Sequence, residues 1–490
     1  MNVLAFDLGG SGGKVLLGRY DGTNIHLESV HRFENSPIPI NSGLYWNIIN
    51  IYQQMNIGIR KAISMTNDTI VSLGIDTFSN DFAFIDRTGE LLSPVRSYRD
   101  HRTQKYKQET YQKMSPETLY SLTGNQNALF NTLMQLSAMR QAGQGHILDN
   151  SYKMLFTPDL LINFLTGEFV SEYTISSVSQ LYSFKDQDWC DIILDTFQIP
   201  KDMLGKLVQP GTIIGPTKEE YNKQLQTKGF QVIAVCEHDT ASAFLASVND
   251  RDCAIISSGT WALVGTEIPE PIITEQGLKY NIANEGGYPG RHRLLRNVMG
   301  SWLIQEIREY YKENNQEYSY AELEIFATEA KPFAYLIDVD DPLFFSPGNM
   351  PEKIRTYCSN HYKQAPQTIG ALVRCVYESL AFKYRWTIEK LEHMIFKPLT
   401  SINVVGGGSK SNLMCQFTAN ACNKPVAAGP SEATALGNIL VQLIANKQIT
   451  DISEGKKIIR ASFPTQEFFP EDILIWEKEY LKFKNLLNLD

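Results

Sequence analysis

The 490-residue sequence lacks the features that would mark a membrane, secreted or nucleic-acid-binding protein. No apolar run approaches the roughly 18 residues that a transmembrane helix needs. The first residues read as a strand with no basic segment and no cleavage site, so we expect no signal peptide. The net charge of -9 disfavours nucleic acid, whose phosphate backbone requires a basic footprint. We therefore expect neither a membrane nor a nucleic acid as a partner.

Cysteine pairs and metal-binding motifs are also missing. The seven cysteines are scattered and odd in number, with no C-x-x-C spacing, and the eight histidines show no H-E-x-x-H spacing. This usage is typical of a reducing compartment. We expect buried free thiols in a cytoplasmic protein, and no disulfide framework or zinc site.

What the sequence does contain is a glycine-rich turn near the start of each half. The first lies in VLAFDLGGSGGKVLLG and the second in CAIISSGTWALVG, each between two apolar strands. Glycines let backbone N–H groups converge on a phosphate without Cβ clashes. The first turn is neither a G-x-x-x-x-G-K-[ST] nor a G-x-G-x-x-G motif, and alone it fits an ordinary hairpin equally well. Its twin at 257–260 favours phosphate binding.

The length exceeds what one hydrophobic core supports, so we expect two or three domains, and the two similar halves favour two. The polar stretch Asn249 to Asp252 places their boundary, giving domains 1–248 and 249–490. The first domain begins with predicted strands at 2–8, 14–20 and 24–33, a helix at 44–65, and strands at 70–76 and 81–86. This order, strand-strand-strand-helix-strand, is that of a ribonuclease H-like core as in actin-type ATPases, and it differs from the alternation of a Rossmann sheet.

Further segments follow along the chain. The middle, from about 100 to 230, is more helical and less regular. Residues 231–235 predict a short buried strand, and the apolar spacing of 367–394 predicts one long amphipathic helix. Residues 431–446 and the last 20 residues also read as helices.

Four further motifs could take part in binding or catalysis. Asp239, in His238-Asp239-Thr240, is placed either as a general base or as the N-cap of the helix begun by TASAFLA. Gly406–Gly408 permits close approach of adenine or phosphate, or forms a tight strand–helix turn. The run Asp76–Asp81 predicts a turn with one or two ligand contacts. Arg99-Asp100-x-Arg102 is either a sugar-side network or a surface ion-pair loop.

These segments together resemble the FGGY family of carbohydrate kinases, in register along nearly the whole chain. The strings that carry the resemblance are DLGGSGGKVLL, GIDTFSNDF, YRDHRT, EHDTASA, SSGTWALVG, NEGG, RNVMGSWLIQE, VVGGGSKSN and GPSEATALGN. Within the family the resemblance is strongest to the branch that phosphorylates the 1-hydroxyl of L-rhamnulose from MgATP. It implies an α/β fold of two ribonuclease H-like (actin-like ATPase) domains with a nucleotide and sugar cleft between them. It further implies a monomer or homodimer that uses ATP and Mg²⁺.

The resemblance also implies roles for individual residues. Asp239 would be the proton acceptor, and Asp7 and Asp239 would hold Mg²⁺. The sugar would be bound by Ser79, His238, Asp239, Thr240 and Asn297. The nucleotide would be bound by Gly10, Ser11, Gly12, Gly13, Lys14, Thr260, Gln305 and Gly407.

Because of two departures from the family pattern, the resemblance does not fix which sugar is the substrate. Lys14 stands where the phosphate turn usually ends in Arg, which keeps the charge but loses bidentate geometry. The family string D-T-W-G-V-D-F reads DTFSNDF here, so Ser79 and Asn80 replace Gly and Val. A pocket wall changed in this way can exclude one sugar and bind another. The alternatives are a family kinase for L-fuculose, L-ribulose, D-xylulose or a related sugar, and a non-catalytic, nucleotide-dependent sugar sensor or an actin-like ATPase module.

Overall fold

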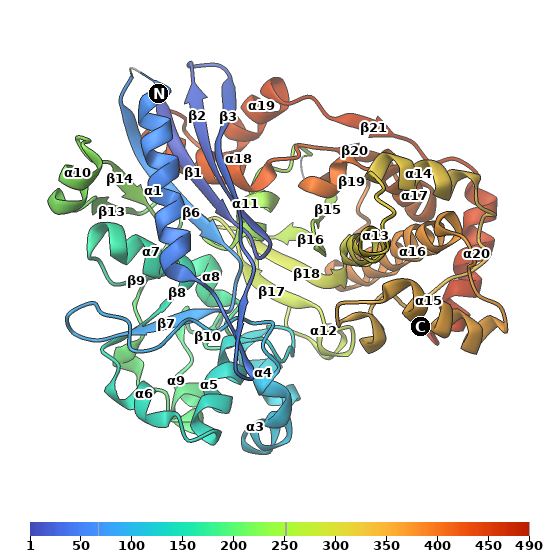
Figure 1. Ribbon diagram of the computed structural model, residues 1–490, viewed down its shortest axis with the longest axis horizontal. Helices are drawn as coiled ribbons and strands as arrows, with labels where there is room; N and C mark the ends of the chain where they lie inside the picture. The colour runs from blue at the N-terminus through green and yellow to red at the C-terminus, as the bar shows by residue number, and fades with distance from the viewer. Residues whose placement is uncertain (67, 250–251, 490) are drawn as a thin grey trace. The chain divides into compact units, whose positions relative to one another are not determined.

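The computed structural model describes residues 1–66, 68–249 and 252–489, and these form two compact units (Figure 1). The first unit comprises Met1–Ala246, Glu267–Leu294 and Ala433–Ser462, and the second comprises Ser247–Thr266, Leu295–Glu432 and Phe463–Asp490. The two units are therefore interleaved along the chain. The division into domains 1–248 and 249–490 stays a prediction, and residues 250 and 251 of its boundary lie outside the described residues.

The first unit is built on a six-stranded sheet with the order β13-β14-β6-β1-β2-β3. The strands are β1 (Asn2–Leu8), β2 (Gly12–Tyr20), β3 (Ile25–Glu34), β6 (Ile70–Thr77), β13 (Ile213–Pro216) and β14 (Gln231–Ile233). Strand β1 pairs antiparallel with β2 and parallel with β6. The predicted α/β class and the order of strands along the chain are thus confirmed.

Two helices cover opposite faces of this sheet (Figure 1). Gly58 of α1 (Ile48–Ser64) packs against Val15, and Gly18 packs against Ile439 of α18 (Ala433–Ala445). Because successive side chains of a strand point to opposite faces, positions 15 and 18 of β2 face opposite ways. The predicted helices at 44–65 and 431–446 therefore sandwich the sheet, as a parallel pairing such as β1–β6 requires.

The helix predicted at 44–65 begins four residues later than expected. A hairpin of β4 (Ile38–Ile40) and β5 (Gly43–Tyr45) pairs Leu44 with Pro39, so these residues are extended. The helix starts at Ile48 because the Asn47 side chain accepts a hydrogen bond from the N–H of Asn50 and caps it.

The middle of the first unit is mostly helical. Much of it packs around a second apolar core, whereas the buried apolar residues within 160–165 and 221–225 join the core of the six-stranded sheet. It contains the hairpin of β7 (Phe82–Ile85) and β8 (Lys153–Phe156), the predicted strand at 81–86 being its first arm. Its helices are α2 (Arg102–Lys105), α3 (Lys107–Lys113), α4 (Pro116–Thr123), α5 (Thr132–Gln141), α6 (Gly145–Asn150), α7 (Thr157–Thr166), α8 (Tyr173–Ser177), α9 (Asp191–Phe197) and α10 (Glu219–Leu225). Short strands β9 (Val170–Glu172) and β12 (Lys206–Val208) pair in parallel, and β10 (Tyr182–Ser183) pairs with β11 (Asp188–Trp189). The expectation of a helical, irregular middle is confirmed.

The remaining elements of the first unit are short. They are α11 (Asp239–Leu245), which packs against α18, and α12 (Glu275–Lys279), β17 (Ala283–Gly286) and α19 (Ile452–Ser462). The predicted strand at 231–235 ends at Ile233, and the chain then runs extended into α11.

A seven-stranded sheet has the order β17-β18-β16-β15-β19-β20-β21. Its further strands are β15 (Cys253–Ser258), β16 (Trp261–Ile268), β18 (His292–Met299), β19 (Ser401–Val405), β20 (Val426–Ala428) and β21 (Gln466–Phe468). The division between the units falls within β16 and within β18. Strand β15 pairs antiparallel with β16 and parallel with β19, which repeats the relation of β1 to β2 and β6.

The second unit contains helices that the sequence patterns predicted and others that they did not. The helices are α13 (Trp302–Glu313), α14 (Tyr320–Glu329), α15 (Met350–Tyr362), α16 (Ile369–Ile395), α17 (Asn412–Cys422) and α20 (Ile473–Leu486). The expected long helix at 367–394 is α16, whose first turn is capped by Thr368. The expected C-terminal helix is α20.

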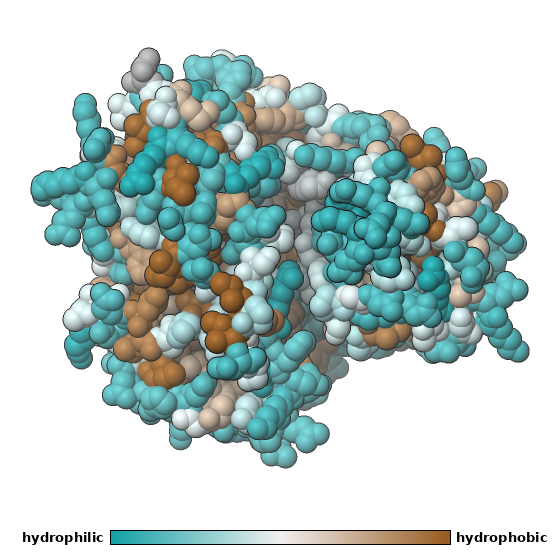
Figure 2. Space-filling view, in the orientation of Figure 1, coloured by the Kyte–Doolittle hydropathy of each residue, from teal (hydrophilic) through white to brown (hydrophobic). Residues whose placement is uncertain are grey.

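The chain buries its thiols and exposes mostly polar groups. All seven cysteines are buried free thiols, as predicted. No helix among the described residues is long and apolar enough to cross a bilayer. The face in Figure 2 is mainly hydrophilic with small hydrophobic patches. Single exposed apolar residues of this kind are ordinary on protein surfaces.

Candidate active site

The first glycine-rich turn joins β1 to β2 in the first unit. The N–H of Gly9 donates to the carbonyl of Gly12 at 2.9 Å, and the Asn35 side-chain amide donates to the carbonyl of Gly9 at 2.9 Å. Gly10 leaves room for the Tyr98 hydroxyl, which would lie 3.0 Å from a Cβ at position 10. The turn is therefore held open at its tip, with backbone N–H groups available for an anion.

Two charged residues flank this turn. Asp7 and Lys14 are paired in the β1–β2 register, and Lys14 Nζ lies 3.5 Å from Asp7 Oδ2. Asp7 is also the register partner of Asp76 on β6, so two carboxylates stand side by side at the ends of parallel strands. Burial, and after it Asp7, raises the pKa of Asp76 well above its usual range. The Asn438 amide of α18 donates to Asp76 Oδ2 at 2.6 Å, while the buried Asp76 Oδ1 has no hydrogen-bond partner.

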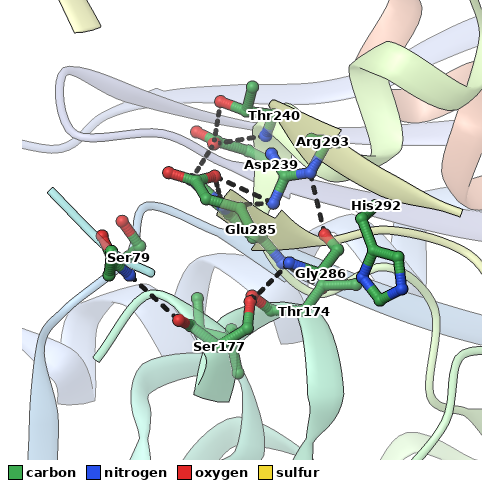
Figure 3. Close-up of polar contacts among 12 residues, drawn as sticks. Ser79, Thr174, Ser177, Asp239, Thr240, Glu285, Gly286, His292 and Arg293 are labelled. Atoms are coloured by element: carbon green, nitrogen blue, oxygen red, sulfur yellow. Dashed lines mark hydrogen bonds and ion pairs between the residues drawn. The ribbon is translucent and has the colours of Figure 1, made fainter. Parts of the chain in front are cut away.

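The candidate base stands at the start of α11 (Figure 3). His238 occupies the N-cap position and Asp239 is the first helical residue, so Asp239 is not the cap. Asp239 Oδ1 accepts hydrogen bonds from the Thr240 N–H at 2.6 Å and the Thr240 hydroxyl at 3.1 Å. Its side chain is 30% exposed, whereas that of His238 is 7% exposed. Asp239 thus has one oxygen fixed by the protein and a face open to a ligand.

His238 is held on all sides by the first unit. Its backbone N–H donates to the Thr174 hydroxyl at 3.2 Å, and its ring Nε2 lies 3.6 Å from Asp239 Oδ1. Ring Nδ1 lies 3.1 Å from Arg293 Nη2 and 3.5 Å from Glu285 Oε2. Figure 3 shows Arg293 and Glu285 side by side behind Asp239. The rigid surroundings fix where the ring and the neighbouring carboxylate point.

Glu285 and Arg293 form a buried ion pair. Arg293 Nη2 lies 3.0 Å from Glu285 Oε2, and their side chains are 1% and 3% exposed respectively. Arg293 Nε also donates to the Gly286 carbonyl at 2.8 Å. Burial alone would raise the pKa of Glu285, but the Arg293 guanidinium outweighs it and holds that pKa below its usual value. The pair therefore places a fixed guanidinium against His238.

The segment between β6 and β7 carries the residues that depart from the family pattern. The Asn80 amide donates to the half-buried Ser79 hydroxyl at 3.0 Å, and the buried Asn80 Oδ1 has no partner. Asp81, which follows, accepts hydrogen bonds from Trp46 Nε1 at 2.6 Å and the Tyr98 N–H at 2.8 Å. This segment is therefore a turn, as predicted, with the Ser79 hydroxyl and an Asn80 oxygen available to a ligand.

The Arg99-Asp100-x-Arg102 motif is largely an ion-pair loop. Asp100 is buried, and its Oδ2 lies 3.2 Å from Arg96 Nη1 and 3.9 Å from Arg102 Nη1. The same oxygen accepts the N–H of Leu44, which ties the loop to the β4–β5 hairpin. Arg99 differs, because its Nη2 would lie 3.8 Å from a Cβ on Gly10 of the phosphate turn.

In the second unit, the turn between β15 and β16 is tied to the start of α13. Ser301 donates through its N–H at 3.0 Å and its hydroxyl at 2.7 Å to the Gly259 carbonyl. Thr260 Oγ1 lies 3.5 Å from Gln305 Oε1, and the Gln305 amide donates to the Ser301 hydroxyl at 3.0 Å. The structure thus brings Thr260 and Gln305 together.

The Gly406–Gly408 turn lies beside it, because β15 and β19 are parallel neighbours with Ser257 opposite Val405. A Cβ on Gly406 would lie 3.1 Å from the Ser258 carbonyl, whereas a Cβ on Gly407 would meet nothing within 4 Å. Gly407 therefore presents open backbone. The turn continues into α17, whose first turn is capped by Ser411.

Asn297 belongs to the second unit, the one that holds Thr260 and Gln305, and it lies on β18. Its side-chain Oδ1 is buried without a hydrogen-bond partner. The other four predicted sugar residues, Ser79, His238, Asp239 and Thr240, are all in the first unit.

The predicted Mg²⁺ ligands are few in number. Among the described residues, no group of three or more histidine, cysteine or acidic side chains is arranged to hold a metal. Asp7 and Asp239 both raise the pKa of the buried Asp76. These carboxylates therefore share one electrostatic environment, which suits a hydrated cation that keeps most of its water ligands.

Several residues of the site carry no signal that we used in the sequence. Arg293 sits in HRLLR, a strand segment with no motif, and Asn438 sits on the apolar helix α18. Glu285 and Asn438 were present only as letters of the NEGG and GPSEATALGN strings. The Arg293–His238 contact joins residues 55 positions apart and the Asn438–Asp76 contact joins residues 362 positions apart, so only the folded chain shows them.

Comparison with known proteins gives the class. The model of the N-terminal domain of the FGGY family of carbohydrate kinases matches residues 2–246, and that of the C-terminal domain matches residues 254–446. The chain therefore belongs to the FGGY family of carbohydrate kinases, and it is a sugar kinase that transfers phosphate.

Individual relatives cover the chain almost completely. It is 38% identical to a rhamnulokinase of Bacteroides thetaiotaomicron over 485 residues, which is 99% of each chain. It is 37% identical to a rhamnulokinase of Oceanobacillus iheyensis, covering 94% of this chain and 96% of the relative.

Solved structures show the same fold at low identity. A ligand-bound xylulose kinase from Lactobacillus acidophilus matches with a TM-score of 0.83 and 18% identity, covering 99% of this chain and 98% of the other. A glycerol kinase with ADP from Plasmodium falciparum matches with a TM-score of 0.79 and 16% identity, covering 99% and 97%. The chain thus has the actin-like ATPase fold of these kinases, as expected.

Proposed function

We propose that this protein phosphorylates L-rhamnulose at its 1-hydroxyl, with ATP as the donor and Asp239 as the general base. The observation that carries the proposal is how the Asp239 carboxylate is held. One of its oxygens is fixed by Thr240, and the side chain remains 30% exposed beside the rigidly held His238. The full-length similarity to rhamnulokinases supports L-rhamnulose as the sugar.

In this proposal Asp239 accepts the proton of the sugar hydroxyl as that oxygen attacks the γ-phosphorus in line. The bond to the β,γ-bridging oxygen breaks, and ADP leaves. Oδ1 stays anchored by Thr240, so the other carboxylate oxygen is the acceptor. An anchored carboxylate costs no reorganisation when the hydroxyl arrives.

The nucleotide would be held by backbone groups more than by side chains. Gly10 to Gly13 would bind phosphate through N–H groups, with Lys14 as the cation, and Thr260, Gln305 and Gly407 would contact the nucleotide. Mg²⁺ bound through water to Asp7 and Asp239 would neutralise phosphate charge. We further propose a cytoplasmic enzyme, since none of its seven buried cysteines forms a disulfide.

The test is ADP release from MgATP by the purified protein, with L-rhamnulose, a panel of other ketoses and a blank without sugar. Turnover with L-rhamnulose well above every other sugar is the expected result. Equal ADP release with and without sugar would contradict a kinase and favour the sensor or ATPase alternative.

A second candidate is the same chemistry on a sister sugar, such as L-fuculose, L-ribulose or D-xylulose. Ser79 and Asn80 favour it, because a hydroxyl and an unpartnered amide oxygen stand where the family has Gly and Val. A site built to hydrogen-bond a particular hydroxyl rejects sugars that lack it. The same panel separates the two candidates.

A further inference from the structure

Nδ1 of His238 faces the guanidinium of Arg293, a group that can donate hydrogen bonds but cannot accept them. Arg293 Nη2 lies 3.1 Å from His238 Nδ1, and both side chains are buried. A guanidinium has five N–H donors and no acceptor, and it is not deprotonated in proteins. A close contact of this length is therefore a hydrogen bond only if Nδ1 accepts.

The competing contact is longer. Glu285 Oε2 lies 3.5 Å from the same Nδ1, beyond normal hydrogen-bond length, and 3.0 Å from Arg293 Nη2. The carboxylate and the guanidinium form an ion pair, although Glu285 Oε2 accepts no hydrogen bond from it. Arg293 is held by a hydrogen bond from Nε to the Gly286 carbonyl at 2.8 Å. Arg293 is consequently fixed in place with an N–H toward the imidazole.

We propose that Arg293 is a positioning residue that fixes His238 in the tautomer with its proton on Nε2. In Figure 3 the Arg293 guanidinium lies beside the Glu285 carboxylate, and Asp239 lies near both. Glu285 balances the charge of Arg293, so the buried guanidinium is retained without an uncompensated charge.

The tautomer decides what His238 can do in the site. Nε2 faces Asp239 Oδ1 at 3.6 Å, so the ring presents a donor toward the reacting region. His238 then cannot accept the proton of a sugar hydroxyl through Nε2, which leaves that role to Asp239. A sugar oxygen that meets the ring must act as an acceptor. This inference rests on the proposed function for its kinetic consequence, but the tautomer itself does not depend on it.

The decisive experiment is a multiple-bond ¹H–¹⁵N NMR correlation on the ligand-free, ¹⁵N-histidine-labelled protein. The His238→Gln variant assigns the signals of His238 among the eight histidines by their loss. We expect a pyridine-type shift for Nδ1 and a pyrrole-type shift for Nε2. A protonated Nδ1, alone or together with a protonated Nε2, would overturn the proposal without the need for any Arg293 variant.

Variants test whether Arg293 is the cause. Arg293→Met should change the His238 pattern toward a tautomer mixture, and Arg293→Lys, which keeps a donor, should restore it. Arg374→Met is the matched control, because Arg374 also pairs with a buried glutamate, Glu378, but in the second unit. It should lower stability and leave the His238 signals unchanged. An unaltered pattern in folded Arg293→Met would also refute the proposal.

Kinetics then connect the tautomer to the reaction. Loss of a residue that orients a functional histidine typically costs about 10- to 100-fold in activity. We expect Arg293→Met to lower kcat by that factor with an unchanged KM for ATP, and Arg293→Lys to recover most of it. If the wild-type protein phosphorylates no sugar, the proposed function is wrong, whereas the NMR experiment still tests the tautomer of His238 independently.

Discussion

Gly408 and Ser258 lie so close that position 408 has no room for a side chain. A Cβ on Gly408 would lie 2.0 Å from Ser258 Oγ and 2.5 Å from Ser258 Cβ, well inside van der Waals contact. Gly407, one residue earlier, would meet nothing within 4 Å. Packing therefore requires glycine at position 408, whereas the open backbone at Gly407 fits the proposed contact with the nucleotide.

This difference predicts opposite behaviour for two alanine variants. Gly407→Ala should fold as the wild type does and raise the Kd for ATP on the order of tenfold, about 1.4 kcal/mol, because the methyl group occupies space that the nucleotide needs. Gly408→Ala should lower the free energy of unfolding by about 1–3 kcal/mol through overpacking. Thermal unfolding without nucleotide and calorimetric titration with ATP measure the two effects. Gly407→Ala binding ATP normally would argue against a nucleotide role for this turn.

Asp239→Asn should remove the base and keep the fold. The amide oxygen of Asn can still accept the Thr240 N–H, so the start of α11 is preserved. We expect kcat to fall on the order of 10² or more, with little change in ATP binding. Asp202→Asn, an exposed residue of the short helix Lys201–Met203, is the control and should be silent. Near-wild-type turnover by Asp239→Asn would exclude the assigned role.

Ser79→Gly should alter the sugar profile more than the affinity for ATP. The substitution removes the hydroxyl that Asn80 now contacts and opens the pocket wall. Ser79→Ala is the matched comparison, since it removes the hydroxyl and keeps the Cβ. If the sugar preference changes in both variants, the Ser79 hydroxyl determines it. If the preference changes only in Ser79→Gly, the volume of the side chain determines it. The measurement is the ratio of kcat/KM values across the ketose panel. Unchanged ratios in both variants would exclude Ser79 from the sugar site.

A buried carboxyl cluster beneath the base predicts pH-dependent stability. Asp159, Glu172 and Glu237 are buried together, and burial is the main cause that raises the pKa of each, that of Glu172 to about 7. Glu172 is protonated in the folded chain over a range where it is ionised when unfolded. Its contribution to stability is full below the unfolded pKa, about 4.5, and is lost as pH rises to about 7.

Glu172→Gln should therefore flatten this part of the profile. Between the unfolded and folded pKa values of Glu172, the substitution should reduce the slope of the free energy of unfolding against pH by at most about 1.4 kcal/mol per pH unit. Urea unfolding between pH 4.5 and 7.5 measures it, with Glu219→Gln on the exposed face of α10 as the control. Identical pH profiles for the wild type and Glu172→Gln would show that Glu172 does not hold a proton in the folded state.

Much of the fold follows from local patterns in the sequence. Alternating and apolar runs predicted β1, β2, β3, β6 and the helices α1, α16 and α18, because burial of one face imposes a period of 2 or 3.6 on side chains. The helix start at Ile48 was missed, because pairing of Leu44 in a hairpin is a contact that periodicity does not encode. The interleaved units could not be read either, since α18 joins the first sheet from more than 350 residues away in sequence.

The sequence by itself determined the α/β class, the two glycine-rich turns, the carboxylate at the head of α11 and the resemblance that places the chain in its family. These features are local, and glycine conformational freedom and strand periodicity act over a few residues. Only the tertiary structure decided that Asp76 is buried against Asp7 and Asn438, that Gly408 is fixed by Ser258, and that Arg293 faces His238. Each of these depends on strand register and helix packing, which bring distant residues within hydrogen-bond reach and exclude water from between them.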